Sequence, residues 1–304
     1  MTAPDHVTPL RLGILGMSEG NGHPYSWAAI FNGFEPAEMA ACPFPSIPSY
    51  LAKQRYPDDF LSSARVTQVW TQDQALSKHI AAASRIERVA DTPEAMIGSV
   101  DAVLLARDDA ANHMQYAGPF LDAGIPIYID KPLAVARRDA EAILTRAGST
   151  APVFSCSALR YARELQPSPS QLKQCGRIRF VDAIVPGKWN TYAVHVIEPV
   201  LAHLVVDDEI AETKAHGFGD LRELVVTWKS GLVTLFSSLG RSASPIGFTI
   251  HGENGNLSFA LRDSFVAFRE ALAHFVEVVR GQRPNIPIAS TLRVVDLIEL
   301  GNRS

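Results

Sequence analysis

The chain has 304 residues, with 28 basic and 32 acidic side chains for a formal net charge of −4, and 47% of its residues are hydrophobic. This length predicts about two domains, and the apolar share is sufficient for a buried core. The balance is slightly acidic, and Lys and Arg form no run. The composition therefore argues against a protein that binds nucleic acids or anionic membrane surfaces.

The cysteines and the N-terminus bear on the compartment. Cys42, Cys156 and Cys175 are odd in number and far apart, so they indicate neither a disulfide framework nor a zinc site. The first residues lack the basic residue and apolar core of a signal peptide, and no stretch approaches the ~18 apolar residues of a membrane span. We therefore expect a cytoplasmic protein.

Residues 8–150 alternate between strand-like and helix-like segments. The pattern predicts strands at 10–15, 66–71, 101–106 and 125–130, and helices at 25–31, 73–84, 109–123 and 138–146. Repeated β-α-β units of this kind imply a doubly wound parallel sheet with helices on both faces. Residues 33–63 contain clustered prolines and no clear period, so this segment is predicted to be a loop or insertion.

The pattern changes after residue 150. Strand-like runs at 224–229 and 232–238 flank a Ser-Gly turn, and runs at 248–252 and 257–260 flank Glu-Asn-Gly. Asn254-Gly255 is a strong hairpin signal. With helices near 192–204, 265–280 and 290–300, residues 151–304 are predicted to form an α+β domain with an open, mainly antiparallel sheet. This domain would follow a Rossmann-type α/β domain at 8–150.

The turn after the first strand is rich in glycine. A strand, a glycine turn and a helix form the usual cradle for a dinucleotide pyrophosphate, which makes Gly16, Ser18, Gly20 and Gly22 candidate cofactor contacts. The loop does not fit Gly-x-Gly-x-x-Gly, because Ser18 holds the third position and the turn is longer. A dinucleotide loop and an ordinary glycine turn both stay open.

The end of the second strand is a test of cofactor type. There an acidic side chain would bind the ribose hydroxyls of NAD, and the predicted strand ends at Thr71, followed by Gln72 and Asp73. A neutral Thr-Gln does not repel a 2′-phosphate, which slightly favours NADP over NAD. If Asp73 reaches back to the ribose, NAD is expected instead.

The stretch from Asp101-Ala-Val-Leu-Leu-Ala through His113 to Asp130-Lys131-Pro132 resembles the glucose–fructose oxidoreductase/inositol dehydrogenase (Gfo/Idh/MocA) family. In that family the corresponding strand ends in Glu-Lys-Pro, and the lysine lies between nicotinamide and substrate. The resemblance implies that Lys131 contacts the cofactor and acts as the acid/base. Its position at the carboxyl end of a parallel strand, where ligands bind, agrees with that role.

The resemblance also implies a second catalytic group, His195. The family pattern is Asp-x-x-x-His at the start of a helix, but Thr191 stands at the aspartate position. Tyr192, on the same helical face as His195, could supply a phenol instead. Trp189, Tyr192 and His195 are candidate substrate contacts, and the competing interpretation of His195 is a hydrogen-bonded structural histidine.

Other candidates carry two interpretations each. Arg107, beside Asp108, sits where the family has Thr-Pro, so it is either a cofactor contact or part of a surface ion pair. His113 either lies at the nicotinamide side or caps a helix. Arg160 follows the expected first strand of the second domain and could meet a substrate hydroxyl or carboxylate. His195, Glu198 and His203 are spaced to point apart on one helix, so no metal is expected.

Three functions remain open at this point. The first is an NAD(P)-dependent oxidoreductase acting on a sugar, sugar derivative or cyclitol, by hydride transfer between a carbinol and nicotinamide. The second is a non-catalytic binding or regulatory protein on the same fold, and the third is an NAD-dependent glycosidase of the same family. The expected partners are a sugar-like small molecule and a second copy of the chain. A homodimer or homotetramer would form through sheet residues such as Val225, Trp228, Val233, Leu235 and Phe248.

Overall fold

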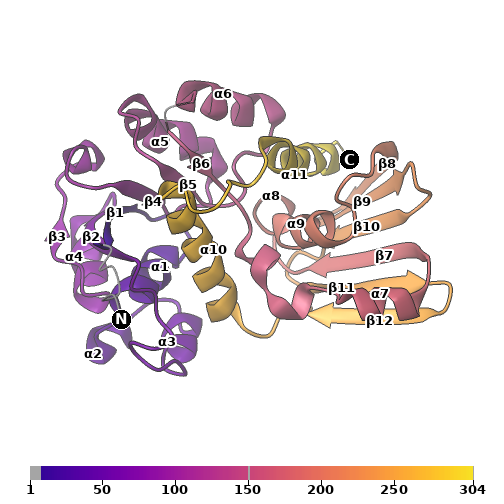
Figure 1. The fold of residues 1–304 in the computed structure, drawn as a ribbon, viewed down its shortest axis with the longest axis horizontal. Helices are drawn as coiled ribbons and strands as arrows, with labels where there is room; N and C mark the ends of the chain where they lie inside the picture. The colour runs from indigo at the N-terminus through magenta and orange to yellow at the C-terminus, as the bar shows by residue number, and fades with distance from the viewer. Residues whose placement is uncertain (1–7, 150, 304) are drawn as a thin grey trace, which may run out of the picture. The chain divides into compact units, whose positions relative to one another are not determined.

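The computed structural model describes residues 8–149 and 151–303, and its contacts divide the chain into two compact units (Figure 1). The first unit comprises the described residues up to Asp130, with Ala142–Phe154 and Arg269–Asn285. The second comprises Lys131–Glu141, Ser155–Phe268 and the described residues from Ile286 onward. The chain therefore crosses between the units several times, whereas the sequence predicted one boundary at residue 150.

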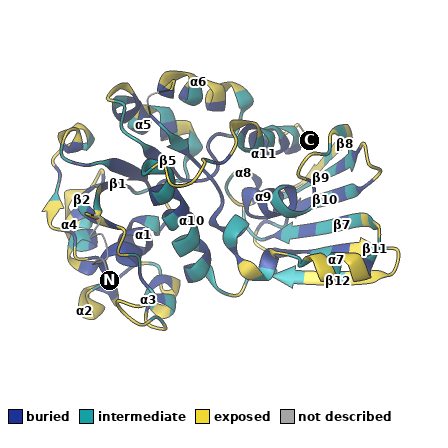
Figure 2. Ribbon diagram, viewed as in Figure 1, coloured by how far each residue is buried: buried dark blue, intermediate teal, exposed yellow. Residues whose placement is uncertain are grey.

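The first unit contains a six-stranded sheet in which every pairing is parallel, so the predicted doubly wound α/β fold is confirmed. Its strand order is β3-β2-β1-β4-β5-β6. The strands are β1 (Leu10–Leu15), β2 (Ala64–Trp70), β3 (Arg88–Val89), β4 (Ala102–Leu105), β5 (Ile127–Ile129) and β6 (Val153–Phe154). The apolar runs of β1 and β4 are almost wholly buried (Figure 2).

Helices pack on this sheet through local signals visible in the sequence. The side chain of Asp73 accepts the backbone N–H groups of Ala75 and Leu76, which begins α4. Pro24 lies in the first turn of α1, and Gly33, at φ 72°, ends that helix. The helical elements are α1 (His23–Asn32), α4 (Gln74–Ala83), α5 (His113–Asp122), α6 (Arg137–Ala147) and α10 (Ser264–Val279), with short 3-10 turns at Pro93–Met96 and Ala110–Asn112.

The proline-containing segment between α1 and β2, predicted to be a loop or insertion, is an insertion with some helical structure rather than a plain loop. It contains two short helices, α2 (Pro36–Met39) and α3 (Ser46–Leu51). Its position is as predicted, because β2 resumes at Ala64 and pairs in parallel with β1. A Cβ atom on Gly22 would overlap Phe44 and Ile47, so this segment packs directly against the glycine turn.

The second unit contains a sheet of order β12-β11-β7-β10-β9-β8, in which only β7 and β10 pair in parallel. The predicted hairpins are present, although the β11–β12 turn is Glu253-Asn254 and Gly255 already begins β12. β7 and β8 were not among the strands predicted from the sequence. The strands are β7 (Ile178–Val185), β8 (Ile210–Phe218), β9 (Leu221–Trp228), β10 (Val233–Ser238), β11 (Gly247–Gly252) and β12 (Gly255–Ala260).

Helices cover one face of this second sheet. α9 contacts β7, and α11 contacts β8 and β9. On β7 the buried residues Val181, Ala183 and Val185 alternate with half-buried ones, which indicates one covered face and one more open face (Figure 2). The helical elements are α7 (Pro169–Cys175), α8 (Trp189–Tyr192), α9 (Val194–His203) and α11 (Ile288–Gly301), with 3-10 turns at Ala158–Tyr161 and Arg163–Leu165.

One expectation about the second domain is wrong. The strand before Arg160, expected to open that domain, is β6, which pairs with β5 at the edge of the first sheet. A two-residue parallel edge strand carries too little pattern to show which sheet it joins. Within the described residues, no helix has both the length and the apolar character needed to cross a bilayer.

Candidate functional site

The glycine turn between β1 and α1 is built by close packing on one side and left open on the other. A Cβ atom on Gly16 would overlap the ring of Pro24. Gly20 has φ +78°, and a Cβ built there meets no atom within 4 Å among the described residues. Gly20 therefore lies on an open side of the turn, near the N-terminus of α1. The first N–H groups of that helix are already used, because His23 donates to the Asn21 side chain and Tyr25 donates to the Gly22 carbonyl. An anion there would be favoured by the helix dipole.

Gln72 holds the start of this turn. Its side-chain oxygen accepts the N–H of Met17 at 3.0 Å, and its side-chain nitrogen donates to the Met17 carbonyl at 2.6 Å. Arg107 donates to the same Gln72 oxygen at 3.1 Å and to the Met17 carbonyl at 3.3 Å. Gln72 follows β2 and Arg107 follows β4, the two strands that flank β1. Side chains at the ends of both strands therefore hold the backbone of the turn at Met17.

Arg107 forms a part-buried ion pair with Asp109 rather than the surface pair considered from the sequence. Its guanidinium donates to both carboxylate oxygens of Asp109, at 2.9 and 2.6 Å, and lies 4.5 Å from the centre of the Tyr116 ring. Burial, the largest single effect, raises the pKa of Asp109. Hydrogen bonds from Arg107 and Asn112 outweigh it and hold that pKa below its usual value.

Ser18 and His113 hold the loop that follows β4. The Ser18 hydroxyl donates to Asp108 at 2.6 Å and accepts the Asp108 N–H at 3.1 Å. His113 is fully buried, and its Nε2 lies 2.8 Å from the Arg107 carbonyl oxygen. Both predicted cofactor residues thus contact the chain's own loops in this structure, and their contact with a cofactor stays a prediction.

Thr71 and Asp73 are engaged at the start of α4. Thr71 is buried, and its hydroxyl donates to the Asp73 carbonyl at 2.6 Å and lies 2.9 Å from the Ser77 hydroxyl. The Asp73 carboxylate accepts the first N–H groups of the helix. The side-chain oxygens of Thr71 and Asp73 are therefore already hydrogen-bonded within the chain. Gln72, between these two residues, is neutral.

The carboxylate at the end of β5 was not foreseen as a contact of the glycine turn. Asp130 is 1% exposed, and its Oδ2 accepts the Asn21 side-chain N–H at 2.8 Å and lies 2.6 Å from His23 Nδ1. The His23 ring stacks on Trp27 with centroids 4.9 Å apart. Asn21 and His23 are polar residues beside Pro24 within the turn. This polar character is the only feature of the sequence that could have indicated a contact with Asp130.

Lys131, the next residue, belongs to the second unit and is 5% exposed. It lines a small cavity of about 10 Å³, enough for roughly one water molecule. The polar and sulfur-bearing residues that share this cavity are Ser155, Cys156, Glu198 and Thr291. A buried ammonium side chain beside a buried carboxyl side chain is an arrangement suited to proton transfer.

His195 lies on α9 and is 9% exposed. Its Nδ1 is 2.8 Å from the Ser157 hydroxyl, and its ring is 5.7 Å from that of Tyr192, which is 39% exposed. Thr191, at the expected aspartate position, donates to the Lys188 carbonyl at 3.4 Å. Trp189 is buried and donates to the Ile298 carbonyl at 2.8 Å, so it supports α11.

Glu198, considered from the sequence only as a metal ligand, belongs to the same cluster as His195. It is 4% exposed, and it accepts the Ser157 N–H at 2.6 Å and a longer bond of 3.4 Å from Arg160. Burial raises its pKa to about 7, against the opposing charge of Arg160. His195 and Glu198 are three residues apart on one helix, and this spacing could have indicated that the two side chains lie near each other.

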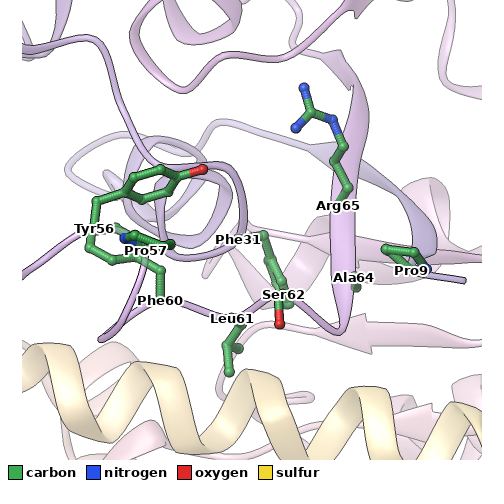
Figure 3. A pocket seen from close by; sticks show the side chains of 9 residues that line it. All are labelled: Pro9, Phe31, Tyr56, Pro57, Phe60, Leu61, Ser62, Ala64 and Arg65. Carbon is green, nitrogen blue, oxygen red and sulfur yellow. The ribbon is translucent and has the colours of Figure 1, made fainter. Parts of the chain in front are cut away.

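Two further observations delimit the site. Among the described residues, no group of three or more His, Cys, Asp or Glu side chains could hold a metal ion. A larger cavity of about 190 Å³ lies in the first unit between Tyr56, Phe60 and Arg65 (Figure 3). It lies at the amino ends of β1 and β2, whereas ligands of open α/β sheets bind at the carboxyl ends.

The comparisons with known proteins agree with this organisation. Residues 48–156 match the model described as "Oxidoreductase family, NAD-binding Rossmann fold". A putative myo-inositol dehydrogenase from Sinorhizobium meliloti 1021 is 15% identical, with a TM-score of 0.75 and 97% of each chain covered. A comparison with curated proteins gave no match.

Two more solved structures share the whole fold. UDP-N-acetylglucosamine 3-dehydrogenase from Acidithiobacillus ferrooxidans is 15% identical, with a TM-score of 0.70, and 97% of this chain and 98% of that one are covered. Biliverdin reductase from Synechocystis sp. PCC 6803, in complex with biliverdin and NADP+, is 15% identical, with a TM-score of 0.72 and coverage of 97% and 99%. At these identities the likeness shows the fold.

Proposed function

We propose that the chain is an NAD(P)-dependent dehydrogenase or reductase of a sugar, sugar derivative or cyclitol, and that it is an oxidoreductase of the Gfo/Idh/MocA family, whose model matches residues 48–156. The observation that carries the proposal is Lys131. It is buried directly after a parallel strand of the first sheet and lines a cavity shared with the raised-pKa carboxyl of Glu198.

The residues of the first unit fit a dinucleotide. The open backbone at Gly20 leaves room for a pyrophosphate close to the positive end of the α1 dipole, and Gln72 and Arg107 hold the turn in one conformation. Asp73 is committed to capping α4 and Gln72 is neutral, which supports a slight preference for NADP over NAD. A bound dinucleotide supplies the hydride acceptor or donor.

The chain's own part in the chemistry is the proton. When a carbinol is oxidised, its carbon loses a hydride and its oxygen loses a proton, and Lys131 Nζ accepts that proton; in the reverse direction it donates one. His195, with its ring fixed through Nδ1, is assigned to the substrate hydroxyl. Tyr192 and Arg160 are assigned to substrate binding.

The test is turnover of a panel of sugars, nucleotide-linked sugars and cyclitols with NAD and with NADP. The proposal expects one class of carbinol to be oxidised with one reduced dinucleotide released for each substrate consumed. Substrate cleavage without net dinucleotide reduction would favour a glycosidase. Saturable binding of a sugar without turnover or dinucleotide binding would favour a regulatory protein.

We further propose that the chain forms a dimer or tetramer through the open face of the second sheet. Val225, Val233 and Leu235 are half-buried there, beside Phe180 and Ile184 of β7. Trp228 and Phe248, expected on this face from the sequence, are buried in the core instead. Leu235→Glu should therefore convert the assembly to a monomer in sedimentation, while Ala211→Glu on the exposed edge should not.

A further inference from the structure

Thr191 stands four residues before His195, where the family pattern has an aspartate, and it donates to the Lys188 carbonyl. We propose that Ser157, held in place by Glu198, is the positioning residue that orients His195 in place of that aspartate. The inference rests on the proposed function of this site, because an oriented imidazole matters there for hydride and proton transfer.

Ser157 is fixed from two sides. It is fully buried, and its backbone N–H donates to the Glu198 carboxylate at 2.6 Å. Its hydroxyl oxygen accepts the Leu159 N–H at 3.2 Å and lies 2.8 Å from His195 Nδ1. The serine is 38 residues from His195 in the chain, so this contact depends on the fold.

The hydrogen bonds select one form of the imidazole. A serine hydroxyl carries one hydrogen, and in this fully buried site the Leu159 N–H is a donor, so among the described residues His195 Nδ1 is the acceptor within reach of that hydrogen. The neutral ring then carries its proton on Nε2, the nitrogen that the serine does not contact. An aspartate, which only accepts, would instead stabilise the charged ring.

Glu198 supports this arrangement and is itself surrounded by titratable groups. Arg160 donates to its carboxylate at 3.4 Å, and Lys131 and Cys156 line the same cavity. The pKa of His203 is lowered mainly by burial, and its Nε2 lies 3.0 Å from the Arg160 carbonyl oxygen. Because either protonation state of Glu198 keeps an oxygen that can accept the Ser157 N–H, the positioning contact persists through neutral pH.

The direct test is nitrogen NMR of the imidazole rings in protein labelled at its 9 histidines, with His195→Asn assigning the His195 signals. The wild type should show a neutral His195 protonated on Nε2. Ser157→Ala should shift those signals to a mixture of the two neutral forms, while Ser157→Thr, which keeps a hydroxyl, should restore them. Ser168→Ala, which removes the cap of α7, is the matched control and should leave them unchanged.

Unchanged His195 signals in Ser157→Ala, or an equal change in Ser168→Ala, would overturn the inference. On the substrate found for the wild type, Ser157→Ala should lower kcat by about 10- to 100-fold and leave dinucleotide affinity nearly unchanged. The NMR result needs no turnover. An enzyme that turns over no substrate would therefore count against the proposed function alone, and the ring signals would still decide the role of Ser157.

Discussion

Two buried carboxyl groups, Asp130 in the first unit and Glu198 in the second, illustrate two uses of a buried acid. Asp130 is 1% exposed and is held by Asn21 and His23 of the glycine turn. Glu198 is 4% exposed, but its guanidinium partner is 3.4 Å away and it lines a cavity with Lys131. The first joins a loop to a strand end, whereas the second holds a proton near neutral pH.

The largest effect is expected at Lys131, which directly follows Asp130 and shares the cavity with Glu198. Lys131→Met keeps much of the stem but removes the ionisable nitrogen, so kcat should fall by roughly 10²–10⁴ while dinucleotide affinity changes less. Steady-state turnover and a cofactor titration measure both. Lys173→Met, at an exposed position on α7, is the control. Full activity in Lys131→Met would refute the assigned proton transfer.

Glu198 should make stability depend on pH. Because its pKa in the folded protein is raised from 4.5 to about 7, the folded state binds this proton more tightly than the unfolded state does. The stability that this provides is complete below pH 4.5 and is lost as the pH rises to about 7, by a total of roughly 3 kcal/mol.

Urea denaturation of the wild type and Glu198→Gln at several pH values tests this. The free energy of unfolding of the wild type should fall relative to that of the variant between pH 4.5 and 7. Asp130→Asn, which keeps Glu198, is measured in the same series and should retain the fall seen in the wild type. A constant difference between wild type and Glu198→Gln across this range would contradict the assignment.

Asp130→Asn should lower stability. The amide presents a donor where the carboxylate accepted from Asn21 and His23, and a lost buried hydrogen bond costs about 1–3 kcal/mol. Asp101→Asn, which removes the exposed pair with Arg11, is the matched control and should cost less than about 1 kcal/mol. Equal losses in the two variants would show that Asp130 is not a special contact of the glycine turn.

The sequence predicts best those strands and helix ends that are determined by residues close together in the chain. The strand at Leu10–Leu15 and the helix capped by Asp73 are set by apolar runs, glycine stops and a capping side chain, and all of these are local. β6 was assigned to the wrong sheet because two residues show no period. β8 was missed because most of its residues are half-buried or exposed, and its pattern lacks a clear apolar face.

The site was predicted in part. Lys131 and His195 are identifiable because a motif surrounds each of them. The contacts around them are not identifiable from the sequence. Ser157 is 38 residues from His195, and Asn21 is 109 residues from Asp130, the residue before Lys131. The raised pKa of Glu198 depends on burial by elements distant in the chain, and no local pattern encodes that burial.

Binding of a nicotinamide dinucleotide by this chain is tested directly by fluorescence titration of the purified protein with NADH and NADPH. We expect saturable binding of at least one of them, tighter for NADPH. Gly20→Asp should weaken that binding by about tenfold relative to Gly20→Asn, because it adds a negative charge beside the phosphates. Absence of binding of both dinucleotides to the wild type would contradict the account.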